Sequence, residues 1–192
     1  MPKFYIIAGC NGAGKTTASF EILPQILNCK EFVNADEIAR GLSPFQPETV
    51  ALEAGKLMIK RIQELFNHKA DFAVETTLSS RTYIHTINQA KSLGYEIYLL
   101  YFWLNSPEMA IERVAKRVTQ GGHHIPTDTI HRRYKQGMNY LFDLYAEKVD
   151  KLMIMDNSSG GTEIVARKEI NMPFEVLNTI KFETIKAKSY EK

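Results

Sequence analysis

Short apolar segments alternate with longer amphipathic ones along most of this chain. Five runs of apolar, β-branched or aromatic residues predict buried strands, at 4–8, 32–35, 72–76, 97–104 and 152–155. Between them, apolar side chains recur at helical spacing, most clearly over 50–66 after Pro47-Glu48, a typical helix opening. Alternating strands and helices favour right-handed crossovers and a parallel sheet with helices on both faces, and such sheets bind ligands at the carboxyl ends of their strands. We therefore expect an α/β fold around a five-stranded, mainly parallel sheet.

Residues 162–192 follow this pattern weakly and form a C-terminal extension. Residues 163–167 are expected as an edge strand and 174–185 as a helix, with fraying of the last charged residues. Within the 192 residues we find no repeat, low-complexity tract or linker. Residues 1–192 are therefore predicted to form a single domain.

Composition narrows the choice of partners. Twenty-four basic and 22 acidic residues give a net charge of +2, which argues against nucleic acid or an anionic membrane as the main partner. Cys10 and Cys29 have neither metal-ligand spacing nor the density of a disulfide scaffold, and the chain has no apolar run of membrane-spanning length and no secretory signal. These observations predict a cytoplasmic protein.

The strongest chemical signal is the spacing Gly-x-x-x-x-Gly-Lys-Thr over residues 9–16, between a predicted strand and a predicted helix. Its glycines allow successive backbone N–H groups to point at phosphate oxygens beside a helix N-terminus. Lys15 adds a cation at the β and γ phosphates, and the Thr16 hydroxyl is placed to bind Mg²⁺. The motif predicts MgATP binding by Gly9, Asn11, Gly12, Ala13, Gly14, Lys15, Thr16 and Thr17.

The motif alone does not say how ATP is used. A transporter-type ATPase would have its own signature sequence and an apolar strand that ends in Asp-Glu. The signature has no good match in this chain, and the apolar run Leu152-Met153-Ile154-Met155-Asp156 is followed by Asn157 rather than by a glutamate. The Asn-Lys-x-Asp sequence that reads guanine in GTPases is absent. Two uses of ATP therefore remain: transfer of a phosphoryl group to an acceptor, or an ATP-dependent switch.

Asp36 ends the second predicted strand about twenty residues after the loop, where the edge of the sheet would bring it beside the γ-phosphate. A carboxylate there can accept the proton of an attacking hydroxyl. The alternative is that Asp36 only caps the following helix. Glu37 is the second candidate for the base.

Glu75 closes the third predicted strand, and an acidic residue at the end of an apolar strand is costly unless it faces a polar site. It is predicted to bind the acceptor or a magnesium-bound water. Thr77 and Arg81 follow and are candidates for binding the acceptor's hydroxyls or phosphates. Helix capping by Ser79 or Ser80 explains the same polarity equally well.

A mobile lid is predicted at about 117–133. Ser106-Pro107-Glu108 starts a helix whose expected apolar face is Ile111, Ala115 and Val118, with Arg113 and Arg117 on the opposite side. A loop with two glycines follows, and it includes His123 and His124. Adjacent histidines rarely chelate a metal alone, so a phosphate or lid contact is the expected role.

The second helix of the lid carries Arg132 and Arg133. Its buried face is predicted from Ile130, Tyr134, Leu141 and Tyr145, and Arg133 lies about 60° from that face and Arg132 about 160°. Arg133 is therefore the one expected to turn inward. Two arginine-bearing helix ends around a flexible loop resemble the lid of nucleoside and adenylate kinases, which closes over ATP and offsets charge on the transferred phosphoryl group.

Several motifs together resemble the zeta toxin family over residues 3 to about 158. They are the loop at 9–17, Asn34-Ala35-Asp36-Glu37, Glu75-Thr76-Thr77-Leu78, Ser106-Pro107-Glu108, and Gly121-Gly122-His123 with Ile125-Pro126 and Arg132-Arg133-Tyr134. Toxins of that family are P-loop kinases that phosphorylate a sugar hydroxyl of UDP-N-acetylglucosamine and are inhibited by a small helical antitoxin.

The resemblance implies roles for individual residues. Lys15 would bind phosphate, Asp36 would be the catalytic base, Glu75 and Thr77 would face the sugar nucleotide, and Arg117 would clamp phosphate. The glycine-histidine lid departs from that of the toxins, so the resemblance assigns no second arginine, and it places the chain in the broader branch of predicted ATPases and kinases. Arg133 is the catalytic candidate from helical phase alone.

The sequence thus predicts a kinase that transfers the γ-phosphate of MgATP to a hydroxyl of a small molecule, with a nucleotide sugar such as UDP-N-acetylglucosamine as the suggested acceptor. An ATP-binding switch or ATPase that acts on a protein partner is the alternative. A nucleic-acid end kinase is disfavoured, because the chain has no basic stripe with interleaved aromatic residues.

Overall fold

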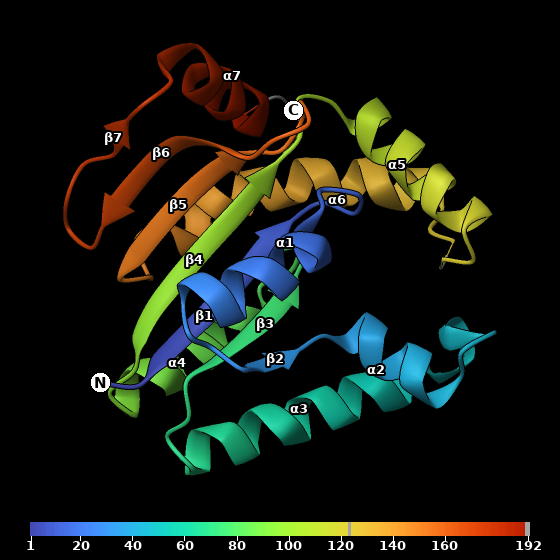
Figure 1. Cartoon of the computed structure of the whole chain (residues 1–192). Helices are drawn as coiled ribbons and strands as arrows, with labels where there is room; N and C mark the ends of the chain where they lie inside the picture. Colours follow the sequence, from blue (N-terminus) through green and yellow to red (C-terminus); the bar gives the residue numbers. More distant parts are fainter. Residues whose placement is uncertain (123, 191–192) are drawn as a thin grey trace.

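The computed structural model describes residues 1–122 and 124–190, and its centre is a single twisted sheet (Figure 1). The strand order is β2-β3-β1-β4-β5-β6-β7. β1 to β5 pair in parallel, whereas β6 and β7 are antiparallel. The strands are β1 (Lys3–Gly9), β2 (Glu31–Val33), β3 (Phe72–Thr76), β4 (Glu96–Trp103), β5 (Lys151–Asp156), β6 (Glu163–Glu169) and β7 (Glu175–Val176).

The five strands predicted for the main sheet are the five parallel ones, so the α/β class is confirmed, but the sheet has seven strands rather than five, because β6 and β7 extend it. β6 was expected at the edge, but β7 pairs with its outer side. β6 returns antiparallel because only a short turn containing Gly160 and Gly161 separates it from β5. β7 has two exposed residues and is too short to show a pattern of alternation.

Helices cover both faces of the sheet, with α1 crossing in front of it in Figure 1 and α4 and α6 behind. The α-helices are α1 (Lys15–Glu21), α2 (Ala35–Leu42), α3 (Ala51–Asn67), α4 (Thr82–Ser92), α5 (Pro107–Thr119), α6 (Thr127–Tyr140) and α7 (Thr179–Tyr190). Two π-helical turns, Ile22–Ile26 and Leu141–Tyr145, continue α1 and α6, and a 3₁₀ turn, Pro47–Val50, precedes α3. Among the described segments, no helix combines the length and apolarity needed to cross a bilayer.

Two helices differ from the expectation. α7 begins at Thr179 rather than near Phe174, because residues 175–176 pair with β6 and the Asn178 side chain caps the helix by accepting from Lys181 N at 3.1 Å. The apolar face of α5 is centred on Ala110 and Val114, whereas Ala115 is exposed. Its start agrees with the prediction, since Ser106 Oγ accepts from Met109 N at 3.2 Å.

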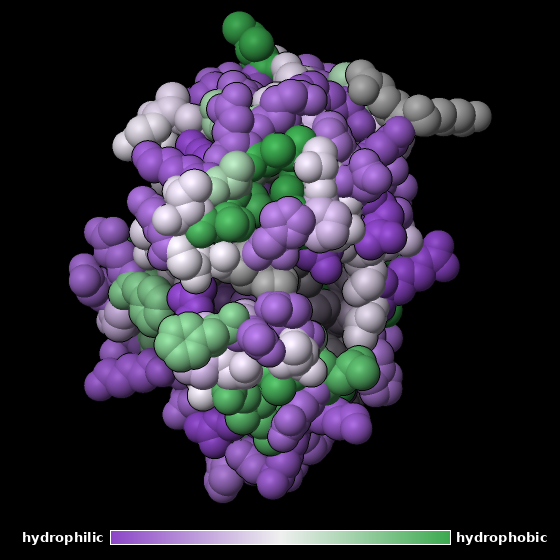
Figure 2. Space-filling view, turned by 90° about the vertical axis from the view of Figure 1, so that its right-hand side faces the viewer, coloured by the Kyte–Doolittle hydropathy of each residue, from purple (hydrophilic) through white to green (hydrophobic). Residues whose placement is uncertain are grey.

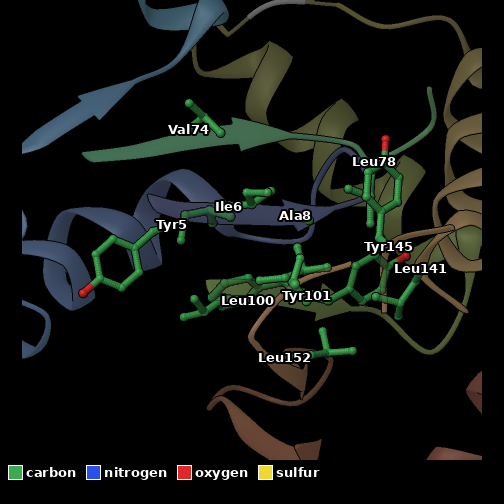
Figure 3. Close-up of a cluster of buried hydrophobic side chains, with 14 of the residues drawn as sticks. Tyr5, Ile6, Ala8, Val74, Leu78, Leu100, Tyr101, Leu141, Tyr145 and Leu152 are labelled. Carbon is green, nitrogen blue, oxygen red and sulfur yellow. The ribbon is translucent and has the colours of Figure 1, made fainter. Parts of the chain in front are cut away.

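The core lies on both sides of β1, whose residues Phe4 to Ala8 are almost completely buried. Figure 3 shows side chains of β1, β3 and β4 meeting Leu78, Leu141 and Tyr145 in one cluster. Leu141 and Tyr145 are buried, as the helical period of that segment predicted. This packing fixes the carboxyl ends of β1, β3 and β4 at a common edge, where the polar residues described next are found.

Candidate active site at the carboxyl edge of the sheet

The loop between β1 and α1 needs glycine at three positions. Gly9, Gly12 and Gly14 have φ angles of 141°, 77° and 81°, which residues with side chains rarely adopt. A Cβ at Gly9 would lie 2.2 Å from the Phe102 carbonyl oxygen, and one at Gly12 would lie 2.7 Å from that of Ala110. No side chain caps the N-terminus of α1, so its first N–H groups can receive an anion.

Lys15 folds back across this loop. Its side chain is 6% exposed, and its Nζ donates to the Cys10 carbonyl at 3.0 Å. The same ammonium lies 3.6 Å from Glu75 Oε1. Burial raises the pKa of the Cys10 thiol to about 11, so Cys10 is an unreactive packing residue here.

Glu75 joins the strand edge to the loop. Its Oε2 accepts from Thr16 Oγ1 at 2.7 Å and from Asn34 Nδ2 at 2.9 Å. A hydroxyl and a carboxylate beside a phosphate loop fit Mg²⁺, which prefers oxygen ligands and usually takes one or two from protein and the rest from phosphates and water. Among the described residues, no group of three or more His, Cys, Asp or Glu side chains is arranged to hold a metal ion.

Asp36 lies at the start of α2, exposed on the wall of the cavity. It is not the helix cap, because Asn34 Oδ1 fills that role by accepting from Asp36 N at 2.9 Å and from Glu37 N at 3.4 Å. Glu37 is 3.6 Å from Arg40 in an exposed ion pair. The capping alternative for the Asp36 side chain is therefore not what the structure contains.

Three arginines surround the loop from the opposite side. Arg113 and Arg117 of α5 line the cavity. Arg133 of α6 donates from Nη1 to Asn11 Oδ1 at 3.1 Å, whereas Arg132 is exposed. Burial lowers the pKa of Arg133, and the nearby carboxylate of Asp36 opposes that shift.

The cavity bounded by these groups has a volume of about 760 Å³. The loop and α1 form its floor, α5 with residues 120–122 forms one wall, and α2 with the segment after it forms the other. Figure 2 views the molecule from this side and shows a hollow between its two halves. Gly122 packs against Arg117, since a Cβ there would lie 2.5 Å from Arg117 Cγ.

Thr77 and Arg81 are not part of this cavity lining. Thr77 Oγ1 is hydrogen-bonded to Ser79 Oγ at 2.8 Å, and the Arg81 guanidinium lies 5.9 Å from the centre of the Tyr140 ring. The chain turns away after β3 because Leu78, with φ of 57°, buries its side chain in the core. His124 is exposed, and His123 lies outside the described residues.

Sequence reasoning assigned no role to two amides at the site. Asn34 ends the β2 segment and holds both Glu75 and the start of α2. Asn157 follows β5, and its Nδ2 donates to the Ala13 carbonyl at 2.8 Å. The only signal available for either was a polar residue directly after an apolar strand.

The central parallel sheet, the phosphate loop after β1 and the arginine-bearing helices define a P-loop fold of the kinase type. The zeta toxin profile matches residues 1–168, and the chain therefore belongs to the zeta toxin family. An uncharacterized protein of Haemophilus influenzae is 31% identical over 134 residues, which are 69% of this chain and 92% of that protein.

Solved structures show the same fold at low sequence identity. A chain of the AvrRxo1-ORF1:AvrRxo1-ORF2 complex crystallised with sulphate ions has a TM-score of 0.80 and 18% identity over all of this chain. This chain spans 65% of that one. The PezAT toxin-antitoxin system of Streptococcus pneumoniae gives a TM-score of 0.70 and 16% identity, covering 98% of this chain and 84% of that one.

Proposed function

We propose that the protein is a kinase that transfers the γ-phosphoryl group of MgATP to a hydroxyl of a small molecule. The observation that supports this most is the arrangement of the cavity walls. The exposed carboxylate of Asp36 lies on one wall, Arg113 and Arg117 lie on the other, and the phosphate loop runs between them. A base beside the γ-phosphate and cations around it are the parts that phosphoryl transfer needs.

Each residue then has a chemical task. The loop amides and Lys15 hold the β and γ phosphates, and Thr16 with Glu75 would hold Mg²⁺, which neutralises charge on the phosphate oxygens when bound. Asp36 accepts the proton of the acceptor hydroxyl as that oxygen attacks the γ-phosphorus, and the bond to the β,γ-bridging oxygen breaks to release ADP. Arg117 and Arg133 stabilise the charge that develops on the transferred group.

For the acceptor we propose a nucleotide sugar such as UDP-N-acetylglucosamine. Membership of the zeta toxin family supports this choice, as does the size of the cavity, which lies within the usual range of small-molecule sites. The lining of the cavity also includes Phe20, Arg40 and Pro44, which offer a ring, a cation and an apolar surface to a second ligand.

We also propose a small helical antitoxin as a protein partner. The support is membership of the zeta toxin family, together with one structural neighbour that belongs to a toxin-antitoxin system. The ATP-dependent switch remains the second candidate, and one surface favours it. Phe45, Leu52 and Ile59, on α3 and the segment before it, are 96%, 86% and 69% exposed, and apolar side chains of this size suit a protein partner.

The test measures ATP consumption and product mass with and without a panel of nucleotide sugars and simple sugars. A kinase converts one member of the panel into a product that is heavier than the acceptor by one phosphoryl group. ATP turnover that no acceptor changes, but that a protein partner does, supports the switch instead. Lys15→Ala should abolish ATP binding or turnover without unfolding the domain, and unchanged ATP affinity and turnover in this variant would refute the P-loop assignment.

Asp36→Asn separates the base from the phosphate clamp. Its ATP affinity should stay near that of the wild type, while transfer falls by roughly 10²-fold or more, as removal of a general base does. Equal loss of binding and transfer would make Asp36 a magnesium ligand instead. If Asp36→Asn retains full transfer and Glu37→Gln loses it, Glu37 is the base.

A further inference from the structure

Helix α7 lies outside residues 1–168, which the family profile matches, yet ion pairs join it to the end of β5 and to the start of β6. Lys181 Nζ lies 2.6 Å from Asp156 Oδ2 and 2.6 Å from Glu163 Oε2. A second lysine of the same helix, Lys188, donates to the Asn105 carbonyl at 2.6 Å, beyond the end of β4. The helix is thus attached at the carboxyl edge of the sheet, where the cavity lies.

Asp156 is the point where this attachment enters the interior. The residue is 3% exposed, and its second oxygen, Oδ1, accepts from Ser158 N at 2.8 Å and from the Ser158 hydroxyl. Burial of a carboxylate without a counter-charge is costly. The ammonium of Lys181 therefore stabilises the turn that runs from Asp156 to Ser158.

The residues of this turn contact the phosphate loop and the arginine wall. Asn157 Nδ2 donates to the Ala13 carbonyl at 2.8 Å, and a Cβ at Gly14 would lie 2.4 Å from the same nitrogen. Ser158 O accepts from Arg113 Nη2 at 3.1 Å, and Arg113 lines the cavity. Polar contacts thus join α7 to the turn at residues 156–158, and further contacts join the same turn to the phosphate loop and to Arg113.

We infer that Lys181 is a positioning residue for nucleotide binding, which acts through Asp156 to hold Asn157 against the phosphate loop and Ser158 against Arg113. The inference rests on the proposed function in one respect, that the loop binds ATP. Its physical basis is that a phosphate site works only when its donors are fixed in place, and small displacements of such groups are costly. Lys181 touches no substrate atom itself.

The experiment compares Lys181→Met with the matched control Lys186→Met. Both lysines belong to α7, but Lys186 is exposed and, within the described chain, its side chain has no hydrogen bond or ion pair. Lys181→Met keeps the aliphatic stem and should raise the Kd for ATP by about three- to tenfold, the factor that one net hydrogen bond corresponds to. Lys181→Arg should recover most of the affinity, since its guanidinium can reach both carboxylates, and Lys186→Met should bind like the wild type.

A double-mutant cycle tests the path through Asp156. Asp156→Asn removes the buried charge, so it should raise the Kd for ATP like Lys181→Met, and the double variant should be no worse than either single variant. The double variant also buries no unpaired charge, so it remains measurable if Lys181→Met alone folds poorly. Glu163→Gln removes only the exposed ion pair of Lys181 and should have little effect on the Kd for ATP.

The outcomes separate the two claims. Unchanged ATP affinity in Lys181→Met, a loss equal to that in Lys186→Met, or additive losses in the double variant would overturn the positioning role while leaving the kinase proposal in place. A wild-type protein that does not bind ATP would overturn the proposed function and this inference together.

Discussion

The contacts of Glu75 make one substitution especially informative, because they allow its cost to be worked out. Glu75→Gln keeps the volume and removes the charge. The hydrogen bonds from Thr16 and Asn34, 2.7 Å and 2.9 Å long, then lose their charge assistance, at about 1 kcal/mol each. A glutamine that keeps its oxygen toward these donors turns its amide nitrogen toward Lys15, whose ammonium lies 3.6 Å from Oε1, for a further loss of about 1 kcal/mol.

We therefore expect the free energy of unfolding of Glu75→Gln to fall by about 3 kcal/mol, measured by urea unfolding without nucleotide. The control is Glu64→Gln, which breaks an exposed pair with Arg61 at 3.2 Å and should cost less than about 1 kcal/mol. If the two variants are equally stable, the cluster around Glu75 contributes nothing to the fold and this reasoning is wrong.

The same variant decides between the two roles left open for Glu75. If Glu75 orients Mg²⁺ or its water, the Mg²⁺ concentration for half-maximal turnover should rise about tenfold or more, as loss of a metal-orienting partner does. The assay is a Mg²⁺ titration of turnover at fixed ATP and acceptor. An unchanged Mg²⁺ requirement with a raised KM for the acceptor would refute the metal role and assign Glu75 to the acceptor.

Three further expectations follow from other contacts. Arg133→Ala should lower turnover far more than ATP affinity, because the negative charge that Arg133 stabilises on the transferred phosphoryl group is largest in the transition state. Arg132→Ala should stay near wild type in both, and measured values of Kd for ATP and of kcat test this. Gly137→Ala should destabilise the fold by about 2 kcal/mol in thermal unfolding, since its Cβ would lie 2.7 Å from a backbone carbonyl oxygen, whereas Gly41→Ala meets open space and should not destabilise it. Burial raises the pKa of Asp156, but the hydrogen bonds from Lys181 and Ser158 more than offset this, so the net pKa is lowered. The ionised carboxylate therefore stabilises the fold above its unfolded pKa of about 4, and this stabilisation is lost as the pH falls through the folded pKa. Asp156→Asn should remove this loss of stability at acid pH, as measured by unfolding between pH 6 and 3.

Local patterns predicted those parts of the molecule that depend on local physics. β1, β3, β4 and β5 could be predicted because strands buried on both faces are continuous apolar runs, whereas β2 lies at the edge of the sheet and is short and only partly buried. The phosphate loop could be predicted because the positive φ angles at Gly9, Gly12 and Gly14 favour glycine strongly, so the glycine spacing marks the loop in the sequence. The inward phase of Arg133 on α6 also followed from helical geometry alone, and the structure has its guanidinium on Asn11.

The remainder depends on contacts between distant segments. Asn157 reaches the loop from 144 residues further along the chain, and nothing near it in the sequence marks that contact. Of the expected apolar face of α5, Ile111 and Val118 do pack against the core, but Ala115 is exposed and the fully buried residues are Ala110 and Val114. Ala110 was missed because its small side chain gives little signal in the sequence. Thr77 and Arg81 follow a strand end at the site, but a buried leucine with positive φ turns the chain away from the cavity there, and that turn has no clear mark in the sequence.

The unequal charges of the two cavity walls give the proposed reaction its direction. The wall formed by α5 carries Arg113 and Arg117, whereas the wall formed by α2 carries Asp36 and a Glu37 that is paired with Arg40. The negatively charged oxygens of a polyphosphate held at the loop are attracted to the first wall and repelled by the second, so they are drawn toward Arg113 and Arg117 and away from the carboxylates. A hydroxyl, which has no charge to be repelled, can occupy the space beside Asp36. An acceptor that carries phosphates of its own needs a cation on the α2 wall, and Arg40 is already paired with Glu37. To bind such an acceptor, Arg40 would have to exchange Glu37 for a phosphate of the acceptor. Neutral and anionic acceptors would be distinguished at that exchange.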